Sequence, residues 1–184
     1  MALDVANPAE RKNEMYERTT KQSHLDTIRY EIDMLIFTFE ELTKQSLEIP
    51  RRYVFLEGFL LHYRTLIQFF AGNRRKHRAG DLSTYEPQTW ARRALTQEEI
   101  NTLQSPGQKL EDQYWTDISQ FLQHSTERRY LEFKDWNVQE MYNDLKTVIT
   151  AFESAFPRPT VIPVSDTLGG GQSTASFTKI EKIF

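Results

Sequence analysis

The sequence predicts an all-α protein: an antiparallel bundle of about four main helices, with short extra helices and a flexible C-terminal tail. Two observations carry this prediction. Apolar residues recur at three- and four-residue steps along most of the chain, which is the spacing of one face of a helix. No segment alternates between apolar and polar residues as a half-buried strand does, so helix packed on helix is the natural architecture.

The longest predominantly apolar stretch is 50–72, and we expect a central helix there. A proline suits its first turn, and Gly72 suits its C-terminal cap. Apolar residues cover most of the circumference of this helix, so other helices should surround it. Glu57, His62 and Arg64 interrupt the apolar pattern, and buried polar side chains need partners.

Two further helices are predicted from apolar repeats. The first repeat predicts a helix over 23–44, preceded by a polar segment, 1–20, that is either a loose arm or a solvated helix leading into it. A capping sequence at 137–140 opens the last helix. This helix carries the apolar residues Met141, Leu145, Val148, Ile149 and Phe152.

Two capping boxes precede the remaining main helix. The first, at 96–99, predicts a short turn that ends near Leu103. The second, at 105–108, has proline at its first helical position and predicts a separate helix over 106–126. A short helical stretch is also expected over 87–95.

The chain divides by composition into an arm or helix over 1–20, a bundle domain over 21–156 and a tail over 157–184. A chain of 184 residues can bury one core without disulfide bonds or metals. The tail is rich in Pro, Gly and Ser and ends in a short apolar and basic stretch, which is typical of a linker with a sticky terminus.

Composition excludes several classes of function. A net charge of −3 gives no global basic field for duplex binding. With no cysteine, the chain has no thiol nucleophile and no thiolate metal site. No metal-binding or phosphate-binding motif is apparent, so no metal or other cofactor is expected. No apolar leader or 20-residue apolar run occurs, and we expect a soluble cytoplasmic protein without a membrane span.

A basic run follows the central helix, in a segment expected to be a loop. Its residues are Arg74, Arg75, Lys76 and Arg78, with His77 between them. The favoured interpretation is that these cations complement the C-terminal dipole of the helix and stay in water. The alternative is a patch that binds phosphate or a partner protein.

Helical geometry determines which of the polar residues can act together. Glu57 and Arg64 lie within about 20° of each other on one face, whereas His62 lies about 160° from Arg64. His62 and Arg64 therefore need partners on different neighbouring helices. His124 and Arg128 are four residues apart and share a face. Such residues either fix the core as satisfied polar groups or converge for metal-independent RNA cleavage, in which His moves a proton and Arg stabilises the phosphorane.

The run from Glu57 to Phe70 also carries a resemblance. Its E-x-x-L-L-H-x-R-x-L-I-x-F-F pattern resembles the hallmark helix of a group of uncharacterised, mostly bacterial helical proteins. In that group an H-x-x-x-R motif and a tryptophan follow, and His124, Arg128 and Trp136 match them. The group is similar in helical layout to HEPN domains, which include ribonucleases of toxin–antitoxin and antiviral systems. The resemblance implies an RNA-directed or accessory component of a bacterial stress or defence module.

For RNA cleavage, the candidate catalytic residues come from two helices. His124 is the candidate acid and base, and Arg128 is the candidate phosphate stabiliser, because one helical turn separates them on a common face. Arg64 would approach from the central helix, and Glu57 would orient one of the arginines.

Whether the protein is an enzyme stays open at this point. The HEPN signature, an Arg followed after four to six residues by a His, occurs only at Arg18 and His24, before the first firm helix. The competing hypothesis is a non-catalytic interaction or structural bundle whose buried Glu, His and Arg residues only fix the core. The candidate partners are RNA, a partner protein or a second copy of the chain.

Overall fold

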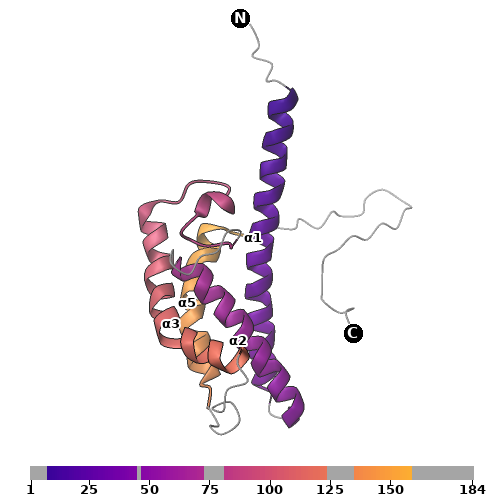
Figure 1. The fold of residues 1–184 in the computed structure, drawn as a ribbon, viewed down its shortest axis with the longest axis vertical. Coiled ribbons are helices and arrows are strands. Elements are labelled where there is room, and N and C mark those ends of the chain that lie inside the picture. Colours follow the sequence, from indigo (N-terminus) through magenta and orange to yellow (C-terminus); the bar gives the residue numbers. More distant parts are fainter. Residues whose placement is uncertain (1–7, 45–46, 73–80, 124–134, 159–184) are drawn as a thin grey trace, which may run out of the picture.

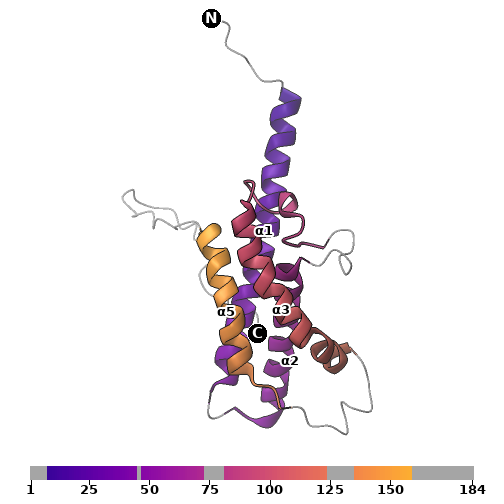
Figure 2. The same ribbon diagram turned by 90° about the vertical axis from the view of Figure 1, so that its left-hand side faces the viewer.

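The part of the chain that the structure describes forms a bundle of four packed α-helices. The computed structural model describes residues 8–44, 47–72, 81–123 and 135–158. The described residues contain no strand, and their elements are α1 (Pro8–Leu42), α2 (Ile49–Ala71), the 3₁₀ helix η1 (Pro87–Thr89), α3 (Gln97–Gln123) and α5 (Val138–Ala155). α2 packs against α1 on one side and α3 on the other, and α5 completes the bundle (Figures 1 and 2). The predicted all-α bundle is confirmed.

The first helix is longer than predicted. α1 has 35 residues, which corresponds to about 50 Å, and its N-terminal part extends beyond the other helices (Figure 1). Of the two predicted alternatives for its start, the helix that leads into the next one is correct from Pro8 onward. Among the side chains of α1 that the structure describes, the buried apolar ones are Leu25, Ile28, Ile32, Leu35 and Leu42.

The second helix forms the centre of the core, as predicted. The left-handed conformation of Gly72 (φ 57°) ends α2, and Phe59, Tyr63 and Phe70 are fully buried. The expectation that neighbours surround α2 on nearly all sides is nevertheless wrong for one face. Val54 and Leu61 remain exposed there, because no described element packs over that side of the α1–α2 pair.

The segment between α2 and α3 covers the C-terminal end of α2. The Thr84 backbone N–H donates to the Phe69 carbonyl at 3.0 Å. The indole of Trp90 is fully buried, and its Nε1 donates to the Ser83 carbonyl at 2.8 Å. The prediction of a helical stretch over 87–95 is therefore wrong beyond the single turn of η1, because the chain turns to bury Trp90 in the core.

The first predicted capping box is present at the start of α3. The Glu99 backbone N–H donates to Thr96 Oγ1 at 3.1 Å, and the Thr96 N–H donates to Glu99 Oε2 at 2.8 Å. This reciprocal pair satisfies two backbone donors that the helix start would otherwise leave without partners. Arg93 also donates to Glu99 and lowers the pKa of its carboxyl group to about 2.

The second capping box does not open a new helix, and the predicted break before 106–126 is wrong. α3 runs without interruption through Pro106, although proline removes one backbone hydrogen bond. Gly107 lies against α2 so closely that a Cβ atom there would be 2.6 Å from the Phe70 carbonyl carbon. This contact with α2 lies directly after the proline and holds α3 in place, so the helix continues.

The last helix agrees with the sequence in its start and its buried face. The Asn137 side chain accepts a hydrogen bond from the Glu140 N–H, and the five apolar residues noted in the sequence of α5 are all buried. Its C-terminal end is held by Arg29, a buried residue of α1 that donates to the carbonyls of Phe156 and Pro157 at 3.3 and 3.1 Å. A cation at the last carbonyls of a helix is stabilising, so Arg29 ties α5 to α1.

Candidate functional site

His62 and Glu31 form a polar pair at the α1–α2 contact. The His62 Nδ1 and Glu31 Oε2 atoms are 2.7 Å apart, with the imidazole donating and the carboxylate accepting. Both side chains are largely buried, and the ring of Tyr30 lies edge-on to His62 with centroids 6.2 Å apart. Because the hydrogen bond joins one position on each helix, it favours one register of α1 along α2.

Arg64 lies on the opposite side of α2. Its guanidinium carbon is 4.5 Å from the centre of the Trp115 ring of α3, which is the geometry of a cation–π contact. Burial lowers the pKa of Arg64 from its usual value. The prediction that His62 and Arg64 face different neighbours is confirmed, since one meets α1 and the other meets α3. Glu57 is half-buried on α2, two turns before Arg64.

The catalytic assignment stays a prediction. His124 and Arg128, its acid/base and phosphate-stabilising members, lie outside the described residues. Arg64 and Glu57, its other members, belong to α2. The predicted phosphate- or partner-binding run also lies outside the described residues, at Arg74, Arg75, Lys76 and Arg78.

A pocket of about 260 Å³ lies where α1, α2 and the segment after α2 meet. Glu31 lines it, so the His62 pair borders this pocket, whereas neither Glu57 nor Arg64 belongs to its lining. Within the described ranges, no three His, Asp or Glu side chains are grouped as a metal site requires. The lining residues are Thr27, Ile28, Glu31, Thr65, Leu66, Gln68, Phe69, Asp81 and Leu82.

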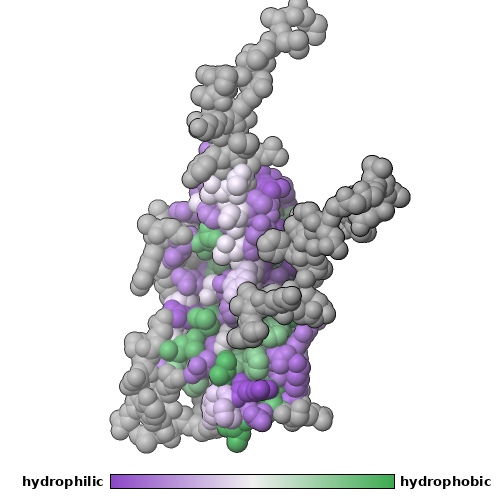
Figure 3. Space-filling view, turned by 90° about the vertical axis from the view of Figure 1, so that its right-hand side faces the viewer, coloured by the Kyte–Doolittle hydropathy of each residue, from purple (hydrophilic) through white to green (hydrophobic). Residues whose placement is uncertain are grey.

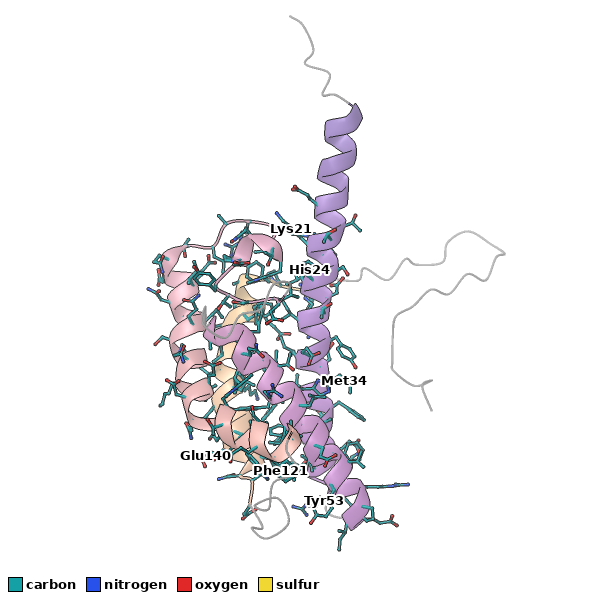
Figure 4. All side chains as sticks on the ribbon, viewed as in Figure 1. Lys21, His24, Met34, Tyr53, Phe121 and Glu140 are labelled. Atoms are coloured by element: carbon teal, nitrogen blue, oxygen red, sulfur yellow. The ribbon has the colours of Figure 1, made fainter. Side chains whose placement is uncertain are left out.

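The most distinctive surface feature is a group of exposed apolar residues on the outer face of α1 and α2, which we call the apolar strip. Tyr30, Phe37, Val54 and Leu61 are 51%, 44%, 67% and 49% exposed, and the half-buried Met34 lies between the two aromatic residues on α1. Figure 3 shows apolar side chains gathered on this face, and Figure 4 labels Met34 on α1. Contiguous exposed apolar surface of this kind marks interaction sites.

The apolar strip is continuous across the two helices. The Phe37 ring packs edge-on against Phe55 of α2, with centroids 6.0 Å apart, and the Tyr30 ring packs against His62. Between these contacts the helices approach closely, since a Cβ at Gly58 would lie 3.2 Å from the Thr38 side chain. The polar pair of Glu31 and His62 therefore lies at the Tyr30 end of the strip and joins both of its helices.

Comparisons of the chain with protein-family models, with curated proteins and with solved structures give no match. Among the described residues, no helix combines the length and apolar character needed to cross a membrane.

A double-mutant cycle measures how far the Glu31–His62 pair fixes the helix contact. We expect Glu31→Ala, His62→Ala and the double variant to show a coupling free energy of about 1 kcal/mol, because each alanine removes one partner of the same hydrogen bond. Urea denaturation followed by circular dichroism measures the free energy of unfolding. Strictly additive effects would mean that packing alone positions His62.

Proposed function

We propose that this bundle is a non-catalytic protein-interaction module that binds a short amphipathic helix of a partner on the apolar strip. One observation carries the proposal: large apolar side chains of α1 and α2 are exposed together on one face. Removing such side chains from water is the main driving force of protein association.

The dimensions of the apolar strip favour a short helical partner. Phe37 follows Tyr30 by seven positions, and Leu61 follows Val54 by seven, which corresponds to about 10 Å of helix in each case. Five side chains fall well below the roughly 20–30 residues per side of a standard protein interface. An amphipathic helix that places anchors at i, i+3 or i+4, and i+7 matches this length. A second copy of the chain would need a much larger contact.

The polar residues of the central helix support the same proposal. His62 is engaged by Glu31, and Arg64 is engaged by Trp115. These contacts join α2 to α1 and to α3 respectively, so they set the positions of the helices that present the strip. A role in fixing helix register accounts for them without a reaction.

The apolar strip is tested with a displayed library of amphipathic helical peptides, selected on the full-length protein. Leu61→Asp should weaken the selected peptides roughly tenfold or more, because binding would bury a carboxylate without a partner. Asn143→Asp adds the same charge to the exposed face of α5 and should leave the affinities unchanged. Titration by fluorescence anisotropy gives the Kd values. Equal affinities for both variants and the wild type would contradict the proposal.

The RNA-directed alternative is a second proposal that rests on the HEPN-like resemblance. It is tested by incubating the wild type and His124→Ala with single-stranded and structured RNA and measuring cleavage. Cleavage by the wild type that is lost in His124→Ala, with little change in Tm, would overturn the non-catalytic proposal. An inert wild type together with a clearly destabilised His124→Ala variant is the result expected for a residue that only satisfies the core.

A further inference from the structure

We infer that the C-terminal segment 175–184 folds back onto the apolar strip of its own chain and occupies the surface offered to a partner. The inference rests on the proposed function, since it requires that the strip binds an amphipathic segment. Three features lead to it: the position of the last described residue, the residue pattern of the segment, and the charges beside the strip.

The described chain ends next to the apolar strip. Arg158, its last residue, donates from Nη1 and Nη2 to Asp33 Oδ2 and Oδ1 at 2.9 and 2.7 Å. Asp33 belongs to α1, beside Met34 and one turn from both Tyr30 and Phe37. Paired hydrogen bonds between guanidinium and carboxylate fix orientation as well as distance. These bonds hold Arg158, after which the tail begins, at the edge of the apolar strip.

The last residues have the pattern that such a surface recognises. Phe177, Ile180 and Phe184 are spaced at i, i+3 and i+7, so a helix over 175–184 would gather them on one face. Lys179 and Lys182 fall outside that stripe. Two helical turns of anchors match the two turns that the apolar strip presents on each of its helices.

The connecting residues make the contact easy to form within one chain. Residues 159–174 span roughly 50 Å when extended. This length far exceeds the one helical turn that separates Asp33 from Tyr30 and from Phe37. A tether of this length keeps the segment at an effective concentration on the order of millimolar. A weak intrinsic affinity is then enough for occupancy, and a second chain at ordinary concentrations competes poorly.

Charge also favours this segment. Glu40, three residues after Phe37 on α1, is exposed at the edge of the apolar strip. Asp33 lies on the same edge and is already bonded to Arg158. The lysines of 175–184 carry the complementary charge. A partner would have to displace the segment, so the tail would weaken the partner's apparent affinity for the strip.

Tryptic cleavage after Lys179 in the intact protein tests the inference. The initial rate of release of 180–184 is measured by mass spectrometry under native conditions, with the free peptide 172–184 as reference. We expect the wild type to be cleaved roughly tenfold more slowly than the peptide, because cleavage follows the population of the undocked segment. Leu61→Asp on the strip and Phe184→Asp on the segment should each remove this protection. Asn143→Asp should keep it.

Each other outcome overturns the inference. Cleavage of the wild type as fast as the peptide means that the segment does not dock. Protection retained in Leu61→Asp places the segment elsewhere, and protection that rises with protein concentration assigns the contact to a second copy. The proposed function is judged separately by the library peptides. If peptide binding depends on Leu61 while the segment 175–184 is unprotected, the apolar strip is still a site for a partner helix. Only the docking of 175–184 on it is then wrong.

Discussion

Phe59→Ala is expected to lower the free energy of unfolding by about 3–5 kcal/mol, the range for removing a buried aromatic side chain. Phe59 is fully buried at the centre of α2, and its ring packs against Phe39 and Tyr63 with centroids 6.4 and 5.7 Å apart. Large rings fixed on separate helices cannot collapse far into the space that alanine leaves. Urea denaturation with circular dichroism measures the loss.

Val54→Ala is the matched control for Phe59→Ala. Val54 belongs to the same helix but lies on the apolar strip, where most of its side chain remains in water. Its truncation should change stability by less than about 0.5 kcal/mol. A loss below about 1 kcal/mol for Phe59→Ala would show that the α2 core is loosely packed and would undermine the fold as described.

Gly107→Ala is expected to destabilise the protein by about 2 kcal/mol, although alanine is the better helix former by about 1 kcal/mol. An added Cβ would lie 2.6 Å from the Phe70 carbonyl carbon and 2.7 Å from the Ala71 nitrogen. These are backbone atoms of α2 and cannot rotate away, so α3 must move off α2. Overpacking of this kind costs about 1–3 kcal/mol, and a backbone obstacle places it at or above the upper end.

Gly58→Ala separates helix propensity from the steric effect. Gly58 also lies inside a helix, but its nearest obstacle is the Cγ2 atom of the Thr38 side chain at 3.2 Å, which needs to shift by only a few tenths of an ångström. It should therefore lose clearly less stability than Gly107→Ala. If Gly107→Ala were instead stabilising, α2 and α3 could not approach at that point as the structure describes.

Local signals in the sequence were sufficient to locate α2, α5 and much of the core. The five apolar residues noted in the sequence of α5, with the first at Met141, are all buried, and the capping box at Thr96 is present. Caps and apolar periodicity act within about one helical turn, so they can be recognised without knowledge of the fold. The same geometry predicted that His62 and Arg64 face different neighbours.

The tertiary structure alone decided the features that depend on contacts between distant segments. Glu31 as the partner of His62, and Trp115 as the partner of Arg64, have no signal in the local sequence. The residues around Pro106 predict the start of a helix, yet contact with α2 keeps Pro106 inside α3.

The apolar strip shows the same division at the surface. The sequence makes α2 apolar over most of its circumference, and this pattern alone predicts burial on nearly every side. Leu61 is exposed because α1 and α3 occupy other sides of α2 and no described helix covers this one. Apolar periodicity determines which residues can be buried, but the placement of the neighbouring helices determines which of them are.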